Sequence, residues 1–191
     1  YHHDGTPVSG YPQGTPVQFP NWISVLDTDG DGKEEVIASK SYYGTTVLYG
    51  DGGASSNQLT SGVGDGRNFG CQPAYADVDD DGVLDMVLAH RNADQLSVHD
   101  QATGALKAKW AYGASANITE GLVVADLDGD GDMEVLALDN GAGLNIFHHT
   151  GAAYAPWPNG TITSTGSTEA GSIITVGNVD ADADPEIIVS H

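Results

Sequence analysis

The sequence predicts an all-β protein, a β-propeller-like array of about four blades, from three observations. An acidic segment returns four times without gaps, and its first residues, Asp27, Asp77, Asp126 and Asn178, are 50, 49 and 52 residues apart. Short apolar runs flank every copy. No window of about 11 or more residues shows the apolar period of a helix. Repeats of this size with three or four strands are typical of propeller blades, which bury both faces of a small sheet by stacking.

Each repeat is predicted to contain at least three strands in a fixed order. The first is the apolar run before the acidic segment, such as "NWISVL", "GLVVA" or "SIITV". The second follows the segment, as "EVIAS", "DMVLA", "EVLAL" or "EIIVS", and the third ends in a turn, as "TVLYGDGG", "LSVHDQATG" or "NIFHHTGA". Runs of about four to six residues rich in Val, Ile and Tyr, bounded by Gly, Asn and Asp, are typical of strands.

We expect residues 1–191 to form a single repeat domain, with repeat loops at 27–35, 77–85, 126–134 and 178–186. The opening "YHHDGTPVSGYP" resembles "FHHTGAAYAPWP", with Tyr1 at the place of Phe147. Residues 1–20 are therefore predicted to be the late strand of a preceding or last blade. Three assemblies remain open: part of a larger propeller, a closed four-bladed ring, or an open stack. In the stack, the N-terminal strand of one chain would complete the last blade of another, giving a homo-oligomer or filament.

Carboxylates or an amide stand at positions one, three, five and nine of each acidic segment, numbered from its first residue. Position seven holds Lys33, Val83, Asp132 or Asp184, and this variety suggests a backbone carbonyl ligand there. Calcium takes six to eight oxygens at about 2.3–2.6 Å, so we expect about four Ca²⁺ ions, one per loop, each stapling the turn between two strands. The candidate side-chain ligands are Asp27, Asp29, Asp31, Glu35, Asp77, Asp79, Asp81, Asp85, Asp126, Asp128, Asp130, Glu134, Asn178, Asp180, Asp182 and Glu186.

The first half of each loop also matches an EF-hand, but the second half does not. An EF-hand needs a bidentate acid at position twelve and a helix on either side. Position twelve here is Ala38, Leu88, Ala137 or Val189, and the flanking runs are predicted strands. We therefore reject the EF-hand and predict a nine-residue loop between strands. The alternative of solvated acidic turns that bind no ion does not explain four loops in one register.

The charge balance limits the partners. The chain has 27 acidic and 6 basic residues, and its net charge of −21 repels phosphate backbones and anionic lipids. No stretch approaches the roughly 18 apolar residues that span a bilayer. We therefore predict no nucleic-acid partner and no membrane insertion, and a divalent cation as a partner. The single cysteine, Cys71, excludes a Cys-based zinc site, and Asn117 and Asn159 lie in sequons for glycosylation.

The loops resemble the FG-GAP / VCBS-type calcium-binding repeat, whose pattern is D-x-D-x-D-G-x-x-D followed by a short apolar strand. Residues 77–89 fit this pattern best, and "NFG" at residues 68–70 resembles the Phe-Gly half of the family's name. The repeat is found in integrin α-subunit propellers and in many secreted bacterial proteins, including rhamnogalacturonan lyases. The resemblance implies a propeller fold, bound calcium, and an extracellular, secreted or cell-surface location.

Two functions are weighed, and we favour the first. It is a non-catalytic, calcium-stabilised extracellular repeat module for adhesion, scaffolding or filament assembly, with other protein chains or carbohydrate as partners. The alternative is the propeller portion of a secreted carbohydrate-active enzyme, such as a polysaccharide (rhamnogalacturonan-type) lyase. Such a lyase needs a basic residue near calcium, and the six Lys and Arg do not cluster with histidines in the sequence. No catalytic residue is predicted. Trp22, Trp110 and Trp157 could stack on sugars or pack between blades.

Overall fold

The computed structural model describes residues 1–9, 22–28, 30–40, 44–48, 71–90, 95–111, 118–139, 143–155, 157, 173–180 and 182–190. Across these residues it contains twelve β-strands and no helix, which confirms the all-β prediction. No helix in this part of the chain could cross a membrane. The strands are β1 (Trp22–Leu26), β2 (Glu35–Lys40), β3 (Gly44–Leu48), β4 (Ala74–Ala76), β5 (Asp85–His90), β6 (Gln95–Asp100), β7 (Leu106–Ala111), β8 (Ile118–Ala125), β9 (Glu134–Asp139), β10 (Leu144–His148), β11 (Ile174–Gly177) and β12 (Glu186–Val189).

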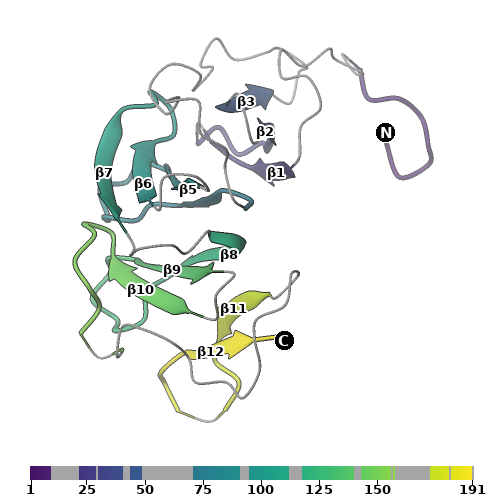
Figure 1. Ribbon diagram of the computed structural model, residues 1–191. Helices are drawn as coiled ribbons and strands as arrows, with labels where there is room; N and C mark the ends of the chain where they lie inside the picture. Colours follow the sequence, from purple (N-terminus) through teal and green to yellow (C-terminus); the bar gives the residue numbers. More distant parts are fainter. Residues whose placement is uncertain are drawn as a thin grey trace.

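These strands form four antiparallel sheets, one for each predicted repeat. The sheets are β1–β2–β3, β4–β5–β6–β7, β8–β9–β10 and β11–β12. In every sheet an acidic loop joins the first two strands, so the predicted order of strand, loop and strand is confirmed. Figure 1 shows the sheets following one another along an arc, as blades do, with the N-terminal segment lying apart from them.

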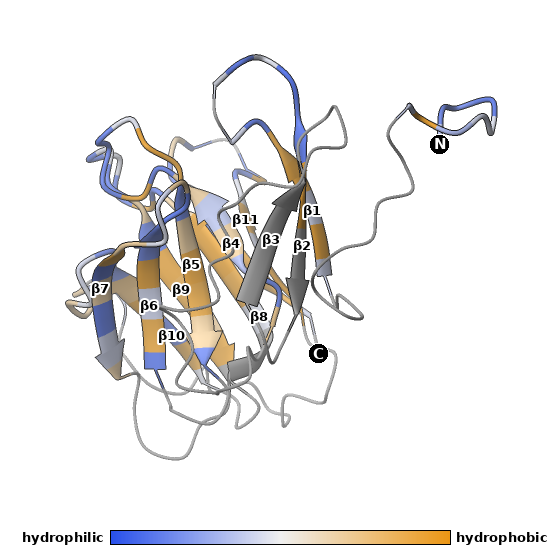
Figure 2. Cartoon of the chain, turned by 90° about the horizontal axis from the view of Figure 1, so that it is seen from above, coloured by the Kyte–Doolittle hydropathy of each residue, from blue (hydrophilic) through white to orange (hydrophobic). Residues whose placement is uncertain are grey.

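The strands β5 and β9 are buried on both faces because their sheets pack against neighbours on either side. In β5, Met86 packs on one face near Trp22 of β1, whereas Val87 belongs to an apolar cluster that includes Val135 of β9. The alternation continues in β9, where Leu136 joins a further cluster shared with β11 and β12. Successive side chains of a strand point to opposite faces, so this pattern requires sheets stacked face to face. Figure 2 shows hydrophobic residues along most of β5 and β9 in the stacked sheets.

The three tryptophans contribute to this packing. Trp22 packs against the cluster of Met86 on β5. Trp110 of β7 lies 5.8 Å from Phe147 of β10, centroid to centroid, at an interplanar angle of 58°. The indole Nε1 of Trp157 donates a 3.2 Å hydrogen bond to a backbone carbonyl of β10. Between the two roles considered for these residues, the structure favours packing between blades.

One backbone turn recurs in three segments of the chain. After β10, the N–H of His148 donates to the Ala152 carbonyl, and the N–H of Gly151 donates to the His148 carbonyl, both at 2.8 Å. The same pair of hydrogen bonds closes the turn at residues 2–6, and a corresponding pair closes the turn after β6 at residues 100–105, which is one residue longer. The predicted likeness between the N-terminal segment and the later hairpins therefore holds for residues 2–6. The assignment of residues 1–20 as a blade strand remains a prediction, since residues 10–20 lie outside the described part.

A buried chain of hydrogen bonds runs along the face of the β4–β7 sheet that packs toward β1. Ser97 Oγ lies 2.8 Å from His90 Nε2 and 3.0 Å from His99 Nε2. His99 Nδ1 lies 3.3 Å from the carbonyl oxygen of Gly104, which can only accept, so Nδ1 carries the proton. Burial lowers the pKa of His99 and so favours its neutral form, in which the Ser97 hydroxyl donates to His99 Nε2 and His90 Nε2 donates to Ser97.

Protonation of His99 is expected to destabilise the protein below neutral pH. Burial lowers the pKa of His99, so the unfolded chain takes up this proton at a higher pH than the folded protein does. The contribution of His99 to the free energy of unfolding is present above its unfolded pKa of about 6.5 and is lost as the pH falls through the folded pKa. Thermal unfolding at saturating calcium, from about pH 7.5 to about pH 5.5, should decline less in His99→Gln than in the wild type. Equal declines would contradict this role.

Candidate metal centres in the acidic loops

The backbone of the loops depends on residues with a positive φ. Position six is glycine in three loops, and its φ is +83° at Gly32, +83° at Gly82 and +99° at Gly131. Position four is also left-handed, at Gly30 and Gly129, and at Asp80 with φ 52°. The sharp turn predicted at position six is confirmed in these three loops. Because L side chains are disfavoured in this region, glycine at position six lets the chain turn back over the carboxylates.

We expect Gly82→Ala to destabilise the protein by about 1 kcal/mol and to lower its melting temperature by roughly 2–4 °C. A Cβ at Gly82 would meet no atom within 4 Å, so the cost comes from the positive φ alone. Gly177→Ala is the matched control, because a Cβ there also has open space and Gly177 lies in β11 without a positive φ. Thermal unfolding measures both variants. Equal shifts would show that φ at position six is not the constraint.

The carboxylate at position one organises the turn in the first three loops. It accepts two backbone N–H groups from positions four to six, so those amides face the interior of the loop. The pairs are Gly30 and Gly32 with Asp27 (2.7 and 2.9 Å), Asp81 and Gly82 with Asp77 (3.0 and 2.8 Å), and Gly129 and Gly131 with Asp126 (2.7 and 3.2 Å).

The carboxylate at position five fixes the second half of the loop. In all four loops it accepts the backbone N–H of position seven, at 2.8–3.0 Å. The donors and acceptors are Lys33 with Asp31, Val83 with Asp81, Asp132 with Asp130, and Asp184 with Asp182. These bonds place the position-seven backbone beside the carboxylates, where its carbonyl was predicted to bind the ion.

The carboxylate at position nine is the most enclosed group of each loop. It is the first residue of the second strand, as in the runs quoted from the sequence, because β2, β5, β9 and β12 all begin at position nine. Glu35 is 2% exposed, and Asp85 and Glu134 are fully buried. Burial raises the pKa of the Asp85 and Glu134 carboxyls. Removing a carboxylate from water is costly, so these groups require hydrogen bonds and a nearby cation.

A backbone donor at position two meets each of these carboxylates. The pairs are Thr28 with Glu35 (2.8 Å), Val78 with Asp85 (3.3 Å), Leu127 with Glu134 (2.9 Å) and Val179 with Glu186 (2.7 Å). In every loop, therefore, a hydrogen bond from the backbone N–H of position two to the carboxylate of position nine joins the two ends of the loop. The four loops share this closure even where their other residues differ.

The predicted ligands lie close enough together to hold an ion in three of the four loops. Each group below offers one ligand atom per residue, all within 4.8 Å of one another. Two oxygens on opposite sides of a calcium ion at 2.3–2.6 Å are about 4.6–5.2 Å apart, so the spacing and the oxygen chemistry both fit. The groups are Asp77–Asp79–Asp85, Asp126–Asp128–Asp130, Asp128–Glu134–His148 and Asp180–Asp182–Glu186. In the first loop Asp29 lies outside the described residues, and the structure describes Asp27, Asp31 and Glu35 of the predicted set.

The fourth loop departs from the other three at position one. Its amide, Asn178, donates from Nδ2 to the Asp182 carbonyl at 2.6 Å, instead of accepting the position-six amide. Position six is Ala183, which is not among the described residues with a positive φ. The remaining carboxylates still gather, with the Asp182 N–H donating to Asp180 at 2.8 Å. The loop with asparagine at position one and alanine at position six therefore has a different turn conformation from the other three loops.

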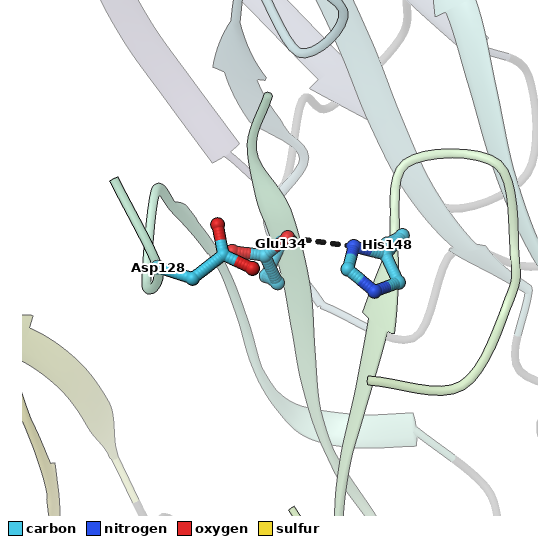
Figure 3. Close-up of side chains that lie close together, drawn as sticks. All are labelled: Asp128, Glu134 and His148. Carbon is cyan, nitrogen blue, oxygen red and sulfur yellow. Dashed lines mark hydrogen bonds and ion pairs between the residues drawn. The ribbon is translucent and has the colours of Figure 1, made fainter. Parts of the chain in front are cut away.

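A histidine that was not among the predicted ligands belongs to the third loop. His148 of β10 lies directly opposite Glu134 in the β9–β10 register. Its Nδ1 is 3.0 Å from Glu134 Oε1, and Asp128 reaches the same carboxylate from the loop, as Figure 3 shows. The neighbouring His149 places Nδ1 3.8 Å from Asp132 Oδ2. The register that pairs the last residue of β10 with position nine brings His148 here, and the sequence pattern did not fix that register.

A lysine enters the second loop, which the sequence did not predict. Lys107 of β7 places Nζ 3.0 Å from Asp79 Oδ1, 2.8 Å from Asp81 Oδ2 and 2.9 Å from Asp85 Oδ1. Burial alone would lower the pKa of this ammonium, but the carboxylates of Asp81, Asp85 and Asp79 outweigh it and raise the pKa. The ammonium in turn lowers the pKa of Asp81. Lys107 is therefore charged, and it neutralises part of this loop.

Comparison with known proteins agrees with the loop geometry. A model of the FG-GAP-like repeat matches residues 77–137 and residues 126–189, and the two matches together cover more than half of the chain. One match begins at the first residue of the second loop, and the other at the first residue of the third. A search of curated proteins found no similar sequence. The repeated match, the four sheets and the recurring loop show that the chain belongs to the FG-GAP-like repeat family.

Proposed function

We propose that this chain is a non-catalytic, calcium-stabilised repeat module that acts outside the cell in adhesion, scaffolding or filament assembly. The observation that carries the proposal is the buried carboxylate at position nine, held beside other carboxylates in a loop that recurs between the first two strands of each sheet. The ligands would be the carboxylates and the amide at positions one, three, five and nine, with the backbone carbonyl at position seven. About four ions would bind, one per loop.

Electrostatics supports a hard divalent cation in these loops. Ionised carboxylates less than 5 Å apart repel one another, and water cannot screen the fully buried Asp85 and Glu134. Calcium accepts many oxygen ligands in flexible geometry, whereas magnesium retains more water and demands a stricter octahedron. Millimolar calcium outside cells would fill even weak sites of this type, which supports an extracellular location.

The two end sheets support an assembly role. Ile23 and Val25 of β1 are 61% and 53% exposed, and Ile188 of β12 is 42% exposed. The equivalent strands in the middle of the array are covered by the next sheet. Exposed apolar residues at both ends are what a larger propeller, a closed ring or a stack of chains would cover. All three assemblies stay open as proposals.

Isothermal titration of metal-free protein with calcium tests the metal assignment. Asp128→Asn should weaken one site by about tenfold or more, because Asp128 belongs to two of the ligand groups. Asp4→Asn is the matched control: it changes the net charge equally, but Asp4 lies in the N-terminal turn and accepts from Thr6. If the protein binds no calcium at millimolar concentration, or if Asp128→Asn and Asp4→Asn change the calcium affinity equally, the assignment of specific sites is refuted.

A cleavage assay tests the non-catalytic assignment. The protein is incubated with pectin fragments, with and without calcium, and new unsaturated ends are followed by absorbance. We expect no cleavage, because Lys107 is held by three carboxylates and a lyase needs a basic group free to abstract a proton. Calcium-dependent cleavage of the pectin fragments would contradict the non-catalytic assignment and favour the lyase alternative.

A further inference from the structure

Among the described residues, the second loop differs from the others because a lysine from a separate strand contacts its carboxylates. We propose that Lys107 is the intrinsic counter-cation of loop 77–85, so that this loop binds calcium more weakly, and needs it less, than it would without the lysine. The inference rests on the proposed calcium function of the loops. It makes the four loops unequal, although their sequences align without gaps.

The lysine and a metal ion would compete for the same oxygens. An ammonium has three N–H donors, and Nζ of Lys107 lies within 3.0 Å of three carboxylates, those of Asp79, Asp81 and Asp85. Two of the three also belong to the candidate metal group with Asp77. A calcium ion at 2.3–2.6 Å from the same oxygens would overlap with the ammonium. Calcium must therefore displace Lys107 before it can use these ligands.

A β-bulge aims Lys107 at the loop. In the β6–β7 ladder Val98 pairs with Ala108 and His99 pairs with Leu106, so Lys107 is an extra residue without a partner on β6. Bulges of this kind redirect a side chain and bend the strand. The side chain of Lys107 is only 22% exposed, although the residue lies on the edge strand of its sheet. The contact is thus built into the sheet.

The corresponding position of the third repeat holds no cation. The shared turn hydrogen bonds align Ala105 with Ala152, so Lys107 corresponds to Tyr154, which is buried and uncharged at neutral pH. In the first loop, the Lys33 ammonium is 3.1 Å from Asp31, but its side chain is 76% exposed. Exposed pairs of this kind are screened by water and contribute little. Within the part of the chain that the structure describes, only the second loop receives a lysine from a different strand.

Calcium titration of Lys107→Met tests the proposal, with Lys109→Met on the same strand as the control for net charge. We expect one site of Lys107→Met to tighten by on the order of tenfold, because the ion no longer displaces charged hydrogen bonds. In chelator, the melting temperature of Lys107→Met should fall below that of wild type, and calcium should raise it by more. Lys109→Met should behave as wild type in both measurements. A Lys107→Met isotherm equal to that of wild type would overturn the proposal.

A second measurement uses the wild-type protein, so it does not depend on the folding of a variant. Acylation of lysines is followed by mass spectrometry in chelator and in calcium. Lys107 should react more slowly than Lys109 in chelator, because its ammonium is engaged by three carboxylates. Equal rates in chelator would overturn the proposal. If the wild-type protein binds no calcium, the proposed function is refuted. If wild type and Lys107→Met bind calcium with the same affinity, only the inference about Lys107 is refuted.

Discussion

Removal of calcium is expected to lower the melting temperature of the protein by roughly 20–40 °C. An ion that binds only the folded state contributes about 2.7 kcal/mol per site at a hundredfold excess over its Kd, or about 11 kcal/mol for four sites. An ordinary domain has a total stability of about 5–15 kcal/mol. The free loops also carry the repulsion of gathered carboxylates, including the fully buried Glu134. The metal-free protein should therefore be close to unfolded at ambient temperature.

Thermal unfolding followed by circular dichroism measures this shift in chelator and after calcium is restored. Chelator already saturated with calcium is the control for other effects of the reagent. Magnesium should restore less of the stability, because it binds fewer protein oxygens and keeps more of its water. An unchanged transition in chelator would mean that the acidic loops fold without a metal, and the proposed function would fail with them.

Most of the fold was predictable because its determinants are local. Each acidic loop carries its own turn signals, and the runs before and after it have the composition of buried strands. The glycines at Gly32, Gly82 and Gly131 have the positive φ that the sequence pattern required. Face-to-face stacking followed from the small size of the repeat, and the alternating contacts of Met86 and Val87 confirm it.

The contacts that distinguish one loop from another were not predictable. Lys107 meets Asp79 across 28 residues, and a single extra residue in β7 decides where its side chain points. His148 reaches Glu134 only because β10 pairs with β9 in that register. A shift of one residue in either ladder would move these side chains to the opposite face. Sequence periodicity does not fix such registers, so the sequence predicted the same calcium site in all four loops.

A large loss of stability is also expected for Gly151→Ala, about 3 kcal/mol, or roughly 6–12 °C in melting temperature. Gly151 has φ +89°, a conformation that costs an alanine energy. In addition, a Cβ at this position would lie 2.7 Å from Cδ2 and 2.8 Å from Cγ of Trp110. The indole ring is held in turn against Phe147, so it cannot move away freely.

Two controls separate the strain from the clash. Gly5→Ala changes the glycine of the equivalent turn, with φ +84° and no atom within 4 Å of the added Cβ. Gly82→Ala tests the positive φ within a loop, again without a clash. Both should cost less than Gly151→Ala. If the three variants lost the same stability, contact with Trp110 would contribute nothing.

The double variant Gly151→Ala/Trp110→Leu then shows what the contact joins. Trp110 belongs to β7 of the second sheet, whereas Gly151 lies in the turn after β10 of the third. If the smaller leucine makes room for the Cβ, the double variant will be more stable than the sum of the two single effects predicts. That coupling would measure a contact between neighbouring blades, because no strand pairing links these two residues. If the stability losses of the two single variants simply add in the double variant, the turn relaxes away from Trp110. The stacking of the two sheets would then depend on the apolar cores and not on this contact.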